Sequence, residues 1–498
     1  MSLFLFVDIS KLVEYNPWWK AEGGIDQDPQ IREFQRSSLK WRPRLMQTFD
    51  WEHDHIYTLR GPRQVGKTTM MKLLIRGLLS KGVDPNCIAY LTCDPLKDQE
   101  DLVETIDAFL SYSERRAGRT RRYLFVDEAP SIKGWERGVK TLADMGRLQG
   151  AVLLLSGSHS LDLKHSTERL PGRRGEGLVN KLLPPMSFLE YMETTRPTVV
   201  KAMSERGFSK ERARGSSILR LVNGDIGQEL IDSMSLYKKE IFEGFESFLI
   251  SGGIIRPMEQ MRRDAKIESS VYELYVSSLI GDMARWRYSE RVTMQVLSSV
   301  IEKMTTRISL NSIAKENEIG SRETVSSYLQ ALEDSFIVRT LFGLAMDRSA
   351  PNYVRERKVY ISDPFIFHAL GAWTAGRTDY HEMSIETTLD RPLKGRMVEM
   401  VVADHLSRLA YDLAPSDVFN LQERLMYWRK KGSDKEVDFV LKHDGALYPV
   451  EVKYRESVDR GQLEGLHNFG KGVLVTKEDL WTHRTYSAIP APYFLLLV

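Results

Sequence analysis

Short runs of apolar residues in the first part of the chain predict buried strands that alternate with helices. The runs occupy residues 55–59, 88–92, 123–128 and 151–155. Residues 69–79 repeat apolar side chains at helical spacing, on a face formed by Met71, Leu74, Ile75 and Leu78. Strands that alternate with helices favour a parallel sheet covered on both faces. The pattern therefore predicts an α/β fold for this part of the chain.

The apolar pattern becomes helical in the middle of the chain. Residues 197–290 combine helical periodicity with many charged positions and predict a group of helices. Residues 310–315 predict a short helix and residues 317–320 a turn, and Ser321 is a suitable N-cap for a second helix. A strand is expected at residues 336–341. This order of elements is typical of a winged helix-turn-helix.

The last part of the chain predicts a helix followed by a β-hairpin. Residues 393–409 present an apolar helical face, and Glu399 lies beside that face. Residues 436–441 and 447–453 predict two strands joined by a turn around Asp444 and Gly445. We therefore expect a second α/β region here.

Composition changes this picture little. The chain has 498 residues, too many for one hydrophobic core, and we expect three or four domains. The net charge of +2 does not by itself indicate a nucleic-acid-binding protein. The only cysteines are Cys87 and Cys93, which argues against a disulfide framework and favours a cytoplasmic protein. No apolar run is long enough for a membrane span, so no membrane partner is expected.

A phosphate-binding sequence lies between the first predicted strand and helix. It fits the pattern G-x-x-x-x-G-K-[ST] and consists of Gly61, Pro62, Arg63, Gln64, Val65, Gly66, Lys67 and Thr68. Its glycines let backbone N–H groups approach phosphate oxygens, and the helix N-terminus adds positive potential. Lys67 is expected to contact the β- and γ-phosphates of ATP, and the Thr68 hydroxyl to bind Mg²⁺. Thr69 completes the expected nucleotide-binding set.

Two acids at the end of the third run complete the expected ATPase site. Asp127 would hold Mg²⁺ directly or through water, and Glu128 would polarise the attacking water as a general base. An apolar run that ends in Asp-Glu is common by chance, but behind a phosphate-binding loop it predicts ATP hydrolysis. Ser156 and Ser158 follow the fourth strand and could sense the γ-phosphate, although an ordinary turn explains them equally well.

These segments together resemble the AAA+ ATPases, and within them a prokaryotic family with a nuclease-like C-terminal domain. The resemblance rests on residues 61–68, 123–128, 156–158, 170–173 (LPGR) and 184–190 (PPMSFLE). Residues 16–19 (NPWW) and 245–257 (FESFLISGGIIRP) also resemble segments of that family.

The resemblance implies ATP and Mg²⁺ as cofactors and a helical lid on the ATPase core. It also implies a homo-oligomer formed through the ATPase domain, in which an arginine reaches the γ-phosphate of a neighbouring subunit. Arg173 could be this arginine, and a solvated basic loop is the alternative.

The second helix of the expected winged helix-turn-helix has two alternative roles. It could enter the major groove of DNA. However, its outward residues include one cation, Arg322, and phosphate contacts require lysine and arginine. A structural or protein-contact role is the other explanation.

Acidic residues and a lysine on the predicted C-terminal hairpin form a candidate metal site. Period-two geometry places Glu451 and Lys453 on one face of their strand, and the hairpin brings Asp438 close by. The two carboxylates would hold a Mg²⁺ ion that stabilises charge on a scissile phosphate. Lys453 would orient or deprotonate the attacking water.

This arrangement resembles the PD-(D/E)xK nucleases over residues 393 to about 476. Asp438 matches the first acid of that fold, and Glu451 and Lys453 match its E-x-K element. Glu399 matches the helical acid that often precedes them. The resemblance implies a deoxyribonuclease with Glu399, Asp438 and Glu451 as metal ligands. A degenerate copy of the fold, which keeps these charges as an ion-pair cluster, is the alternative.

The sequence thus predicts a DNA-associated ATPase with five segments. They are an N-terminal extension at 1–40, an AAA+ core at 41–195, a helical lid at 196–295, a winged helix-turn-helix at 296–350 and a nuclease-like domain at 351–498. Basic residues could guide a DNA backbone, namely Arg424, Arg429, Lys430 and Lys431. ATP would drive or gate action on DNA, with cleavage by the C-terminal domain. The rival is a nucleotide switch or scaffold whose C-terminal domain only binds DNA or a protein partner.

Overall fold

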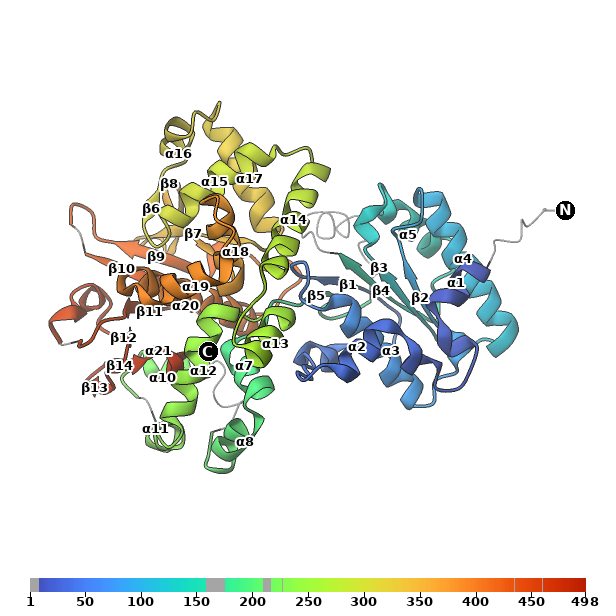
Figure 1. The fold of residues 1–498 in the computed structure, drawn as a ribbon, viewed down its shortest axis with the longest axis horizontal. Coiled ribbons are helices and arrows are strands. Elements are labelled where there is room, and N and C mark those ends of the chain that lie inside the picture. Colours follow the sequence, from blue (N-terminus) through green and yellow to red (C-terminus); the bar gives the residue numbers. More distant parts are fainter. Residues whose placement is uncertain (1–8, 158–174, 209–215, 226, 434, 459) are drawn as a thin grey trace. The chain divides into compact units, whose positions relative to one another are not determined.

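The chain forms two compact units, residues 1–184 and residues 185–498 (Figure 1). The structure is a computed structural model and describes residues 9–157, 175–208, 216–225, 227–433, 435–458 and 460–498. Ser158 and Arg173, two candidates for the nucleotide site, lie outside these ranges.

The first unit is built on a parallel sheet, which confirms the fold that the alternating pattern predicts. Its strands are β1 (His55–Arg60), β2 (Ile88–Thr92), β3 (Arg122–Asp127), β4 (Ala151–Gly157) and β5 (Asn180–Leu182). Their order is β2-β3-β4-β1-β5, and each neighbouring pair is parallel. The polar residues that follow the strands are therefore gathered at one edge of the sheet.

Helices cover both faces of this sheet (Figure 1). On one face lie α4 (Gln99–Ala117) and α5 (Trp135–Asp144), where Phe109 and Val139 pack in one core with Leu124 and Leu153 of the strands. On the other face lies α3 (Lys67–Ser80), with α2 (Pro29–Arg36) packed against it. From β1 the chain crosses to β2 at one edge of the sheet, and from β2 it returns through β3 to β4. Because both crossovers are right-handed, the connecting helices lie on opposite faces.

The N-terminal segment is docked on the edge strand β2, after the short helix α1 (Ser10–Tyr15). The Asn16 side chain accepts a hydrogen bond of 2.6 Å from the N–H of Tyr90 and donates one of 2.8 Å to its carbonyl. The indole N–H groups of Trp18 and Trp19 both donate to the carbonyl of Ile88, at 3.1 and 2.8 Å. The NPWW segment thus satisfies backbone groups that an edge strand would otherwise expose.

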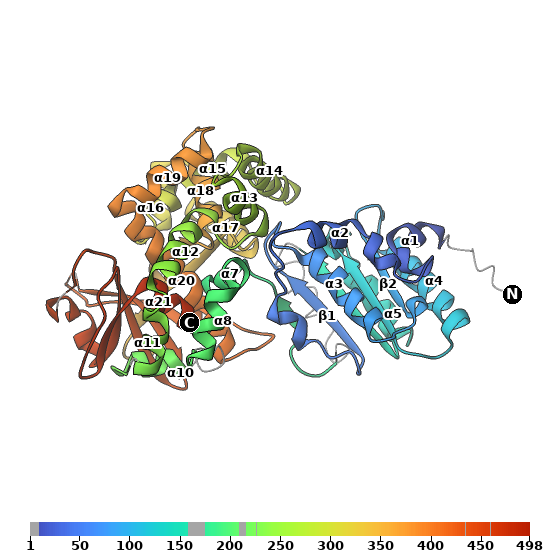
Figure 2. The ribbon, with the colours of Figure 1, turned by 60° about the horizontal axis from the view of Figure 1, so that its bottom comes forward.

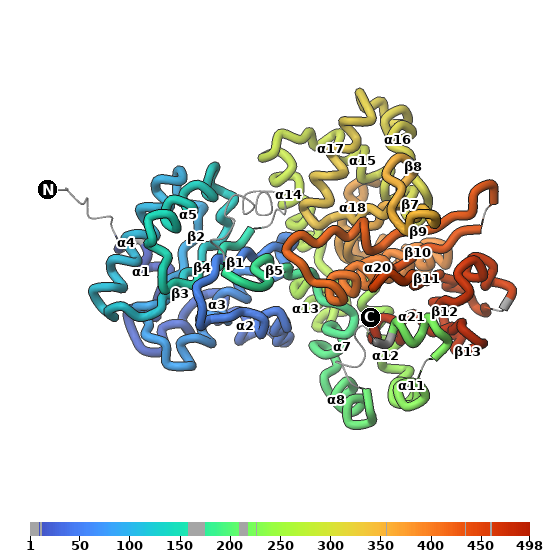
Figure 3. The backbone as a smooth tube through the Cα atoms, turned by 180° about the vertical axis from the view of Figure 1, so that it is seen from behind, coloured from blue at the N-terminus to red at the C-terminus, as the bar shows by residue number. Residues whose placement is uncertain are grey.

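The second unit begins with a group of helices (Figure 2). They are α7 (Phe188–Thr195), α8 (Pro197–Glu205), α10 (Ser216–Leu221), α11 (Gln228–Ser235), α12 (Lys238–Ser251), α13 (Ile255–Asp264), α14 (Ser269–Arg285) and α15 (Glu290–Glu302). The AAA+ core was expected to end at residue 195, whereas the boundary between the units lies after residue 184. The difference arises because α7 packs against α12 and against the C-terminal helix α21 (Ala491–Leu497) (Figure 3).

Gly253 marks a close approach of two chain segments within the second unit. The N–H of Met186 donates to the carbonyl of Gly253 at 2.8 Å, and the N–H of Gly253 donates to Asp363 at 2.8 Å. A Cβ atom on Gly253 would lie 2.3 Å from the carbonyl oxygen of Met186. A glycine is therefore required for the packing of this segment.

Two helices and a strand lie near the positions that the apolar pattern predicts, namely α16 (Leu310–Glu316), α17 (Arg322–Asp334) and β7 (Val338–Ala345). Two further strands, β6 (Arg307–Ile308) and β8 (Ala350–Ile361), were not predicted. Ser321 caps α17 as expected, because its hydroxyl accepts a hydrogen bond of 3.1 Å from the N–H of Thr324. The antiparallel β7–β8 hairpin has a register shift at Phe342 and Gly343, so that residues 353–356 bulge from the ladder.

One sheet continues through the rest of the second unit, in the order β13-β14-β12-β11-β10-β9-β7-β8-β6. Its other strands are β9 (Leu425–Arg429), β10 (Glu436–His443), β11 (Ala446–Lys453), β12 (Gly472–Thr476), β13 (Trp481–His483) and β14 (Tyr486–Pro490). Strands β7 and β9 are parallel and pair at Gly343 and Tyr427. The domain boundary expected at residue 350 therefore falls inside a continuous sheet.

The predicted C-terminal helix and hairpin are both present. Helix α20 (Arg391–Leu413) packs against β10, after α18 (Pro364–Thr374) and α19 (Tyr380–Leu389). Asp444 and Gly445 turn the chain between β10 and β11, with φ values of 48° and 74°. Among the described residues, no helix combines the length and the apolar character needed to cross a membrane.

Candidate functional sites

The phosphate-binding loop connects the end of β1 to the start of α3. Gly66 has a φ of 97°, which is a left-handed conformation that glycine adopts without strain. A Cβ atom on Gly61 would lie 2.1 Å from the carbonyl oxygen of Leu183. Both glycines are therefore required by the backbone of the loop itself, as well as by the phosphate contacts that the motif predicts.

Lys67 is held inside this loop. Its side chain is buried, and its Nζ donates to the carbonyls of Gly61 and Pro62 at 2.9 and 3.0 Å. The ammonium group thus lies over the loop whose N–H groups would receive phosphates. From this position the ammonium group could leave the two carbonyls and contact phosphate oxygens when a nucleotide binds.

Asp127 ends β3 and accepts three hydroxyl groups. The Thr68 hydroxyl donates to Oδ2 at 2.6 Å, and the Tyr90 hydroxyl donates to the same oxygen at 2.9 Å. The Ser156 hydroxyl donates to Oδ1. The structure therefore brings together Thr68, Asp127 and Ser156, which the sequence analysis selected, and adds Tyr90, which it missed.

Glu128 follows Asp127 in a left-handed conformation, with a φ of 51°. Its N–H donates to the Ser156 hydroxyl at 3.3 Å, so β4 supports the turn that carries it. A positive φ is uncommon for a residue with a Cβ and often marks a functional site. Because the chain turns here, Glu128 does not continue the buried face of β3, and its side chain is partly exposed.

The residues of the first unit fit a nucleotide with Mg²⁺. The Thr68 hydroxyl and the Asp127 carboxylate place oxygen atoms side by side, and Mg²⁺ prefers oxygen ligands. The glycine loop supplies backbone N–H groups at the N-terminus of α3, where a phosphate is favoured electrostatically.

The second unit brings together the acids and the lysine of the predicted nuclease site. The Lys453 ammonium pairs with Oε1 of Glu451, and the N–H of Asp438 donates to Oε2 of Glu451 at 3.3 Å. The N–H of Val452 donates to Asp438 at 3.0 Å. The geometry of the β10–β11 hairpin is therefore as the period-two pattern predicts.

A buried lysine that the sequence analysis missed lies among these acids. Lys358 of β8 is 1% exposed, and its Nζ lies 2.5 Å from Glu436, 3.0 Å from Asp438 and 3.5 Å from Glu399. The hydroxyl of Tyr360 donates to Glu399 at 2.7 Å. The one available signal was the alternation in β8, which puts Lys358 and Tyr360 on the same face of a strand.

The ionisation of the cluster is shifted by burial and by the two ammonium groups. Burial, reinforced by Asp438, raises the pKa of Glu399 to about 8. Burial also raises the pKa of Glu451, again with a contribution from Asp438. Burial alone would raise the pKa of Asp438 too, but the ammonium groups of Lys358 and then Lys453 hold it below its ordinary value.

This cluster fits a metal ion poorly as it is arranged. Carboxylate oxygens that would ligate Mg²⁺ are already paired with the ammonium groups of Lys358 and Lys453. Within the part of the chain that the structure describes, no three His, Cys, Asp or Glu side chains form a group that could hold a metal. The ammonium groups of Lys358 and Lys453 thus balance the carboxylate charges of the cluster.

Comparison with known protein families assigns three segments of the chain. Residues 53–192 match the family model described as an AAA domain. Residues 243–377 and 394–494 match two models that are each described as a domain of unknown function. No curated protein matches the chain.

The chain is similar to solved structures only at a low level. The Aeropyrum pernix ORC2 protein in ADPNP–ADP complexes is 12% identical, with a TM-score of 0.31 over 66% of this chain and 89% of that chain. The Aeropyrum pernix ORC1 protein in complex with DNA is 15% identical, with a TM-score of 0.29 over 75% of this chain and 94% of that chain. Cdc6p from Pyrobaculum aerophilum is 13% identical, with a TM-score of 0.23 over 68% of this chain and 90% of that chain. At these scores the likenesses carry no argument about fold or activity.

The assignment of the first unit therefore rests on its own residues and on the family match. The glycine loop, the buried Lys67 and the contact between Thr68 and Asp127 all lie within the matched segment. Residues 53–192 are thus similar to AAA domains, and they contain the loop, the lysine and the acid that a P-loop nucleotide site requires.

Proposed function

We propose that the first unit binds ATP with Mg²⁺ and hydrolyses the bound ATP. The observation that carries this proposal is the hydrogen bond of 2.6 Å between Thr68 and Asp127, at the start of a helix whose first residue is the buried Lys67. Lys67 would contact the β- and γ-phosphates, and the backbone N–H groups of residues 63–69 would surround the phosphate chain. Thr68 and Asp127 would hold Mg²⁺, which neutralises phosphate charge during the reaction.

Glu128 would act as the general base in this reaction. Its left-handed backbone directs it away from the buried strand, and Ser156 supports the turn from the neighbouring strand. The Glu128 carboxylate would accept a proton from the attacking water. Ser156 also contacts Asp127, so it would respond to changes at the γ-phosphate through that carboxylate.

The direct test of this proposal is ATP turnover with and without Mg²⁺. We expect release of inorganic phosphate from ATP that depends on Mg²⁺, together with saturable ATP binding measured by calorimetry. An Asp127→Asn variant should retain weak binding and lose turnover. ATP binding that is absent in the wild-type protein would contradict the proposal.

We further propose that the second unit acts on DNA, with the winged helix-turn-helix and the PD-(D/E)xK-like segment as the elements that contact it. Of the two alternatives for the C-terminal segment, Lys358 favours the one without cleavage. The ammonium group of Lys358 offsets the negative charge of Asp438 and Glu399, as a bound metal ion would in a nuclease. The protein would then be a nucleotide switch that binds DNA without cutting it.

The two alternatives are separated by one experiment. Linear, single-stranded and branched DNA are incubated with the protein and Mg²⁺ or Mn²⁺, with and without ATP. No cleavage is expected if the cluster is an ion-pair network. Cleavage that disappears in an Asp438→Ala variant, while ATP turnover persists, would instead establish the nuclease, with Glu451 and Lys453 as its other catalytic residues.

Two further expectations from the sequence are part of this proposal. The ATPase domain would assemble into a homo-oligomer, in which Arg173 reaches the nucleotide of a neighbouring subunit. An Arg173→Ala variant would then lose turnover but keep ATP affinity, and sedimentation with ATP would reveal the assembly. The site of action would be the cytoplasm, where Cys87 and Cys93 remain reduced.

A further inference from the structure

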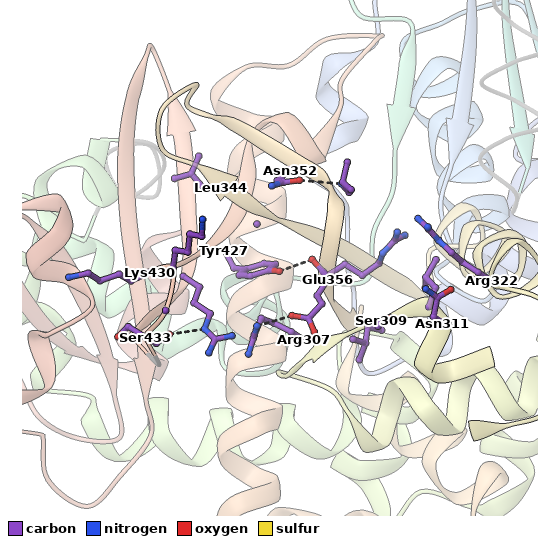
Figure 4. A pocket seen from close by; sticks show the side chains of 18 residues that line it. Arg307, Ser309, Asn311, Arg322, Leu344, Asn352, Glu356, Tyr427, Lys430 and Ser433 are labelled. Carbon is purple, nitrogen blue, oxygen red and sulfur yellow. Dashed lines mark hydrogen bonds and ion pairs between the residues drawn. The ribbon is translucent and has the colours of Figure 1, made fainter. Parts of the chain in front are cut away.

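A cavity of about 660 Å³ in the second unit is lined by cationic side chains (Figure 4). The cations are Arg307, Arg322, Arg357, Arg429, Lys430 and Lys431. The one acid in the lining, Glu356, is paired with Arg307 at 2.7 Å. Most of the positive charge is therefore not balanced by the lining itself. We call this cavity the basic groove.

The cations of the basic groove come from separate chain segments. Arg307 lies on β6, Arg322 begins α17 and Arg357 lies on β8. The remaining three residues, 429–431, follow one another at the end of β9 and in the turn after it. Figure 4 shows Arg322 at one end of the groove and Lys430 at the other, with Tyr427 and Glu356 between them. The charge is thus spread along the groove.

Several of these cations form no ion pair with a carboxylate among the described residues. Arg322 is exposed, and the guanidinium of Arg357 lies 5.0 Å from the centre of the Phe342 ring. Burial and the nearby Arg322 lower the pKa of Arg357. Lys430 and Lys431 are exposed and form no ion pair with any residue that the structure describes. Like charges held together in this way attract an anionic ligand.

We propose that the basic groove binds the sugar-phosphate backbone of duplex DNA. This inference rests on the proposed action on DNA and assigns it a site. A single phosphate could contact only a few of these cations, whereas a chain of phosphates reaches cations on several segments. The groove also presents Ser309, Asn311 and Asn352, whose hydroxyl and amide groups are common ligands of phosphate oxygens.

The lining favours a duplex over a single strand. Proteins that bind single strands stack the bases on exposed aromatic side chains. The aromatic residue of the groove, Tyr427, is 4% exposed, and its hydroxyl donates to the carbonyl of Glu356 at 2.7 Å. Its ring is therefore unavailable for stacking. Contacts to the backbone alone carry no sequence information, so we expect binding that does not depend on the DNA sequence.

The test measures DNA affinity against salt concentration. A fluorescently labelled duplex is titrated with the full-length protein in the absence of ATP and divalent ions, and binding is followed by anisotropy. One variant combines Arg322→Ala with Arg357→Ala, and a second combines Lys430→Ala with Lys431→Ala. The second pair is exposed, so it remains informative if loss of the half-buried Arg357 impairs folding. The matched control combines Lys201→Ala with Lys239→Ala, two exposed lysines of the same unit that do not line the groove.

We expect each groove variant to bind the duplex about tenfold more weakly, which corresponds to about 1.4 kcal/mol. The slope of log affinity against log salt should become shallower by about 0.9 for each phosphate contact that is lost. The control variant should match the wild-type protein. Equal losses in the control, or no loss in the groove variants, would overturn the groove as the site while leaving DNA binding intact.

Other outcomes bear on the partner. A wild-type protein that hydrolyses ATP but does not bind the duplex would overturn this inference and leave the ATPase proposal standing. Preferential binding of a single strand, duplex RNA or polyglutamate, measured by competition, would overturn duplex DNA as the ligand. A wild-type protein that binds the duplex but does not hydrolyse ATP would overturn the ATPase proposal alone.

Discussion

The hydroxyl of Tyr90 donates a hydrogen bond of 2.9 Å to Oδ2 of Asp127, the same oxygen that accepts the hydroxyl of Thr68. Behind this tyrosine, the ammonium of Lys72 lies 3.4 Å from the centre of its ring and pairs with Asp28 at 2.9 Å. Burial and the Asp127 charge raise the pKa of Tyr90 far above its ordinary value, so the hydroxyl remains a donor. Tyr90 therefore positions the carboxylate that is expected to hold Mg²⁺.

Replacing Tyr90 with Phe should slow ATP turnover about tenfold, because a hydrogen bond to a charged group is worth roughly 1.5–3 kcal/mol. The Mg²⁺ concentration needed for half-maximal turnover should rise, which a loss of packing alone would not cause. Steady-state assays over a series of Mg²⁺ concentrations measure both effects. Tyr112→Phe is the control, because its hydroxyl bonds Asn86 in the same unit. An unchanged Mg²⁺ dependence would mean that Tyr90 does not position Asp127.

Replacing Lys67 with Ala should abolish tight ATP binding, because it removes the cation that faces the phosphates. Isothermal titration with ATP and Mg²⁺ measures the loss. Lys81→Ala, at the end of the same helix, removes an exposed lysine and should bind ATP normally. Unchanged ATP affinity in the Lys67 variant would exclude this role.

Replacing Glu128 with Gln should preserve ATP binding and trap the bound ATP. The amide keeps the shape of the side chain but cannot accept the proton of the attacking water. Single-turnover experiments with labelled ATP should therefore show a loss of at least about a hundredfold in hydrolysis, the lower range for a general base. Glu104→Gln, on the exposed face of α4, is the control. Normal turnover would remove Glu128 as the base.

Replacing Lys358 with Met should destabilise the second unit by about 3–5 kcal/mol, the usual cost of breaking a buried ion pair. The acids Glu399, Glu436 and Asp438 would lose their shared cation. Denaturant unfolding, followed by circular dichroism, measures the change. Lys435→Met, an exposed lysine beside β10, should cost little. A Lys358 variant as stable as the wild type would show that the cluster does not depend on this lysine.

The raised pKa of Glu399 predicts that stability falls as pH rises. The folded-state pKa is about 8 and the ordinary value is 4.5, so the folded protein binds more protons between these values than the unfolded chain does. The stability that this pKa shift of Glu399 contributes is fully present below pH 4.5 and is lost as pH rises to about 8. Glu399→Gln, which stays neutral, should flatten this part of the curve of unfolding free energy against pH. A curve with the same slope as the wild type would contradict the shift.

Most residues of the candidate nucleotide site could be selected from the sequence because they lie in two short segments. Residues 61–68 carry the loop, and Asp127 and Glu128 end a run whose apolar character is evident. Tyr90 could not be found this way, because its role depends on the side-by-side pairing of β2 and β3. An apolar run does not reveal which neighbouring strand it will contact.

The second unit was harder to predict, because its important residues meet across long separations. Lys358 and Asp438 are 80 positions apart and lie in segments that the sequence analysis assigned to one domain without linking them. The domain boundary expected at residue 350 separates β7 from β9. In the structure these strands pair, so the segments before and after residue 350 share one sheet. Of the cations of the basic groove, Arg322 and residues 429–431 were noticed in two separate places, whereas Arg307 and Arg357 were not noticed, and their common position depends on that sheet.

The docking of Asn16 on Tyr90 has a consequence for shortened forms of the protein. Removal of the first thirty-six residues, through α2, would expose the backbone N–H and carbonyl of Tyr90 at the edge of β2 and would also remove Asp28, the ion-pair partner of Lys72. We expect such a fragment to self-associate by adding a strand of another molecule to the exposed edge of β2. The proposed nucleotide site would also be affected, since Tyr90, whose backbone is bound by Asn16, donates its hydroxyl to Asp127, the carboxylate that is expected to hold Mg²⁺.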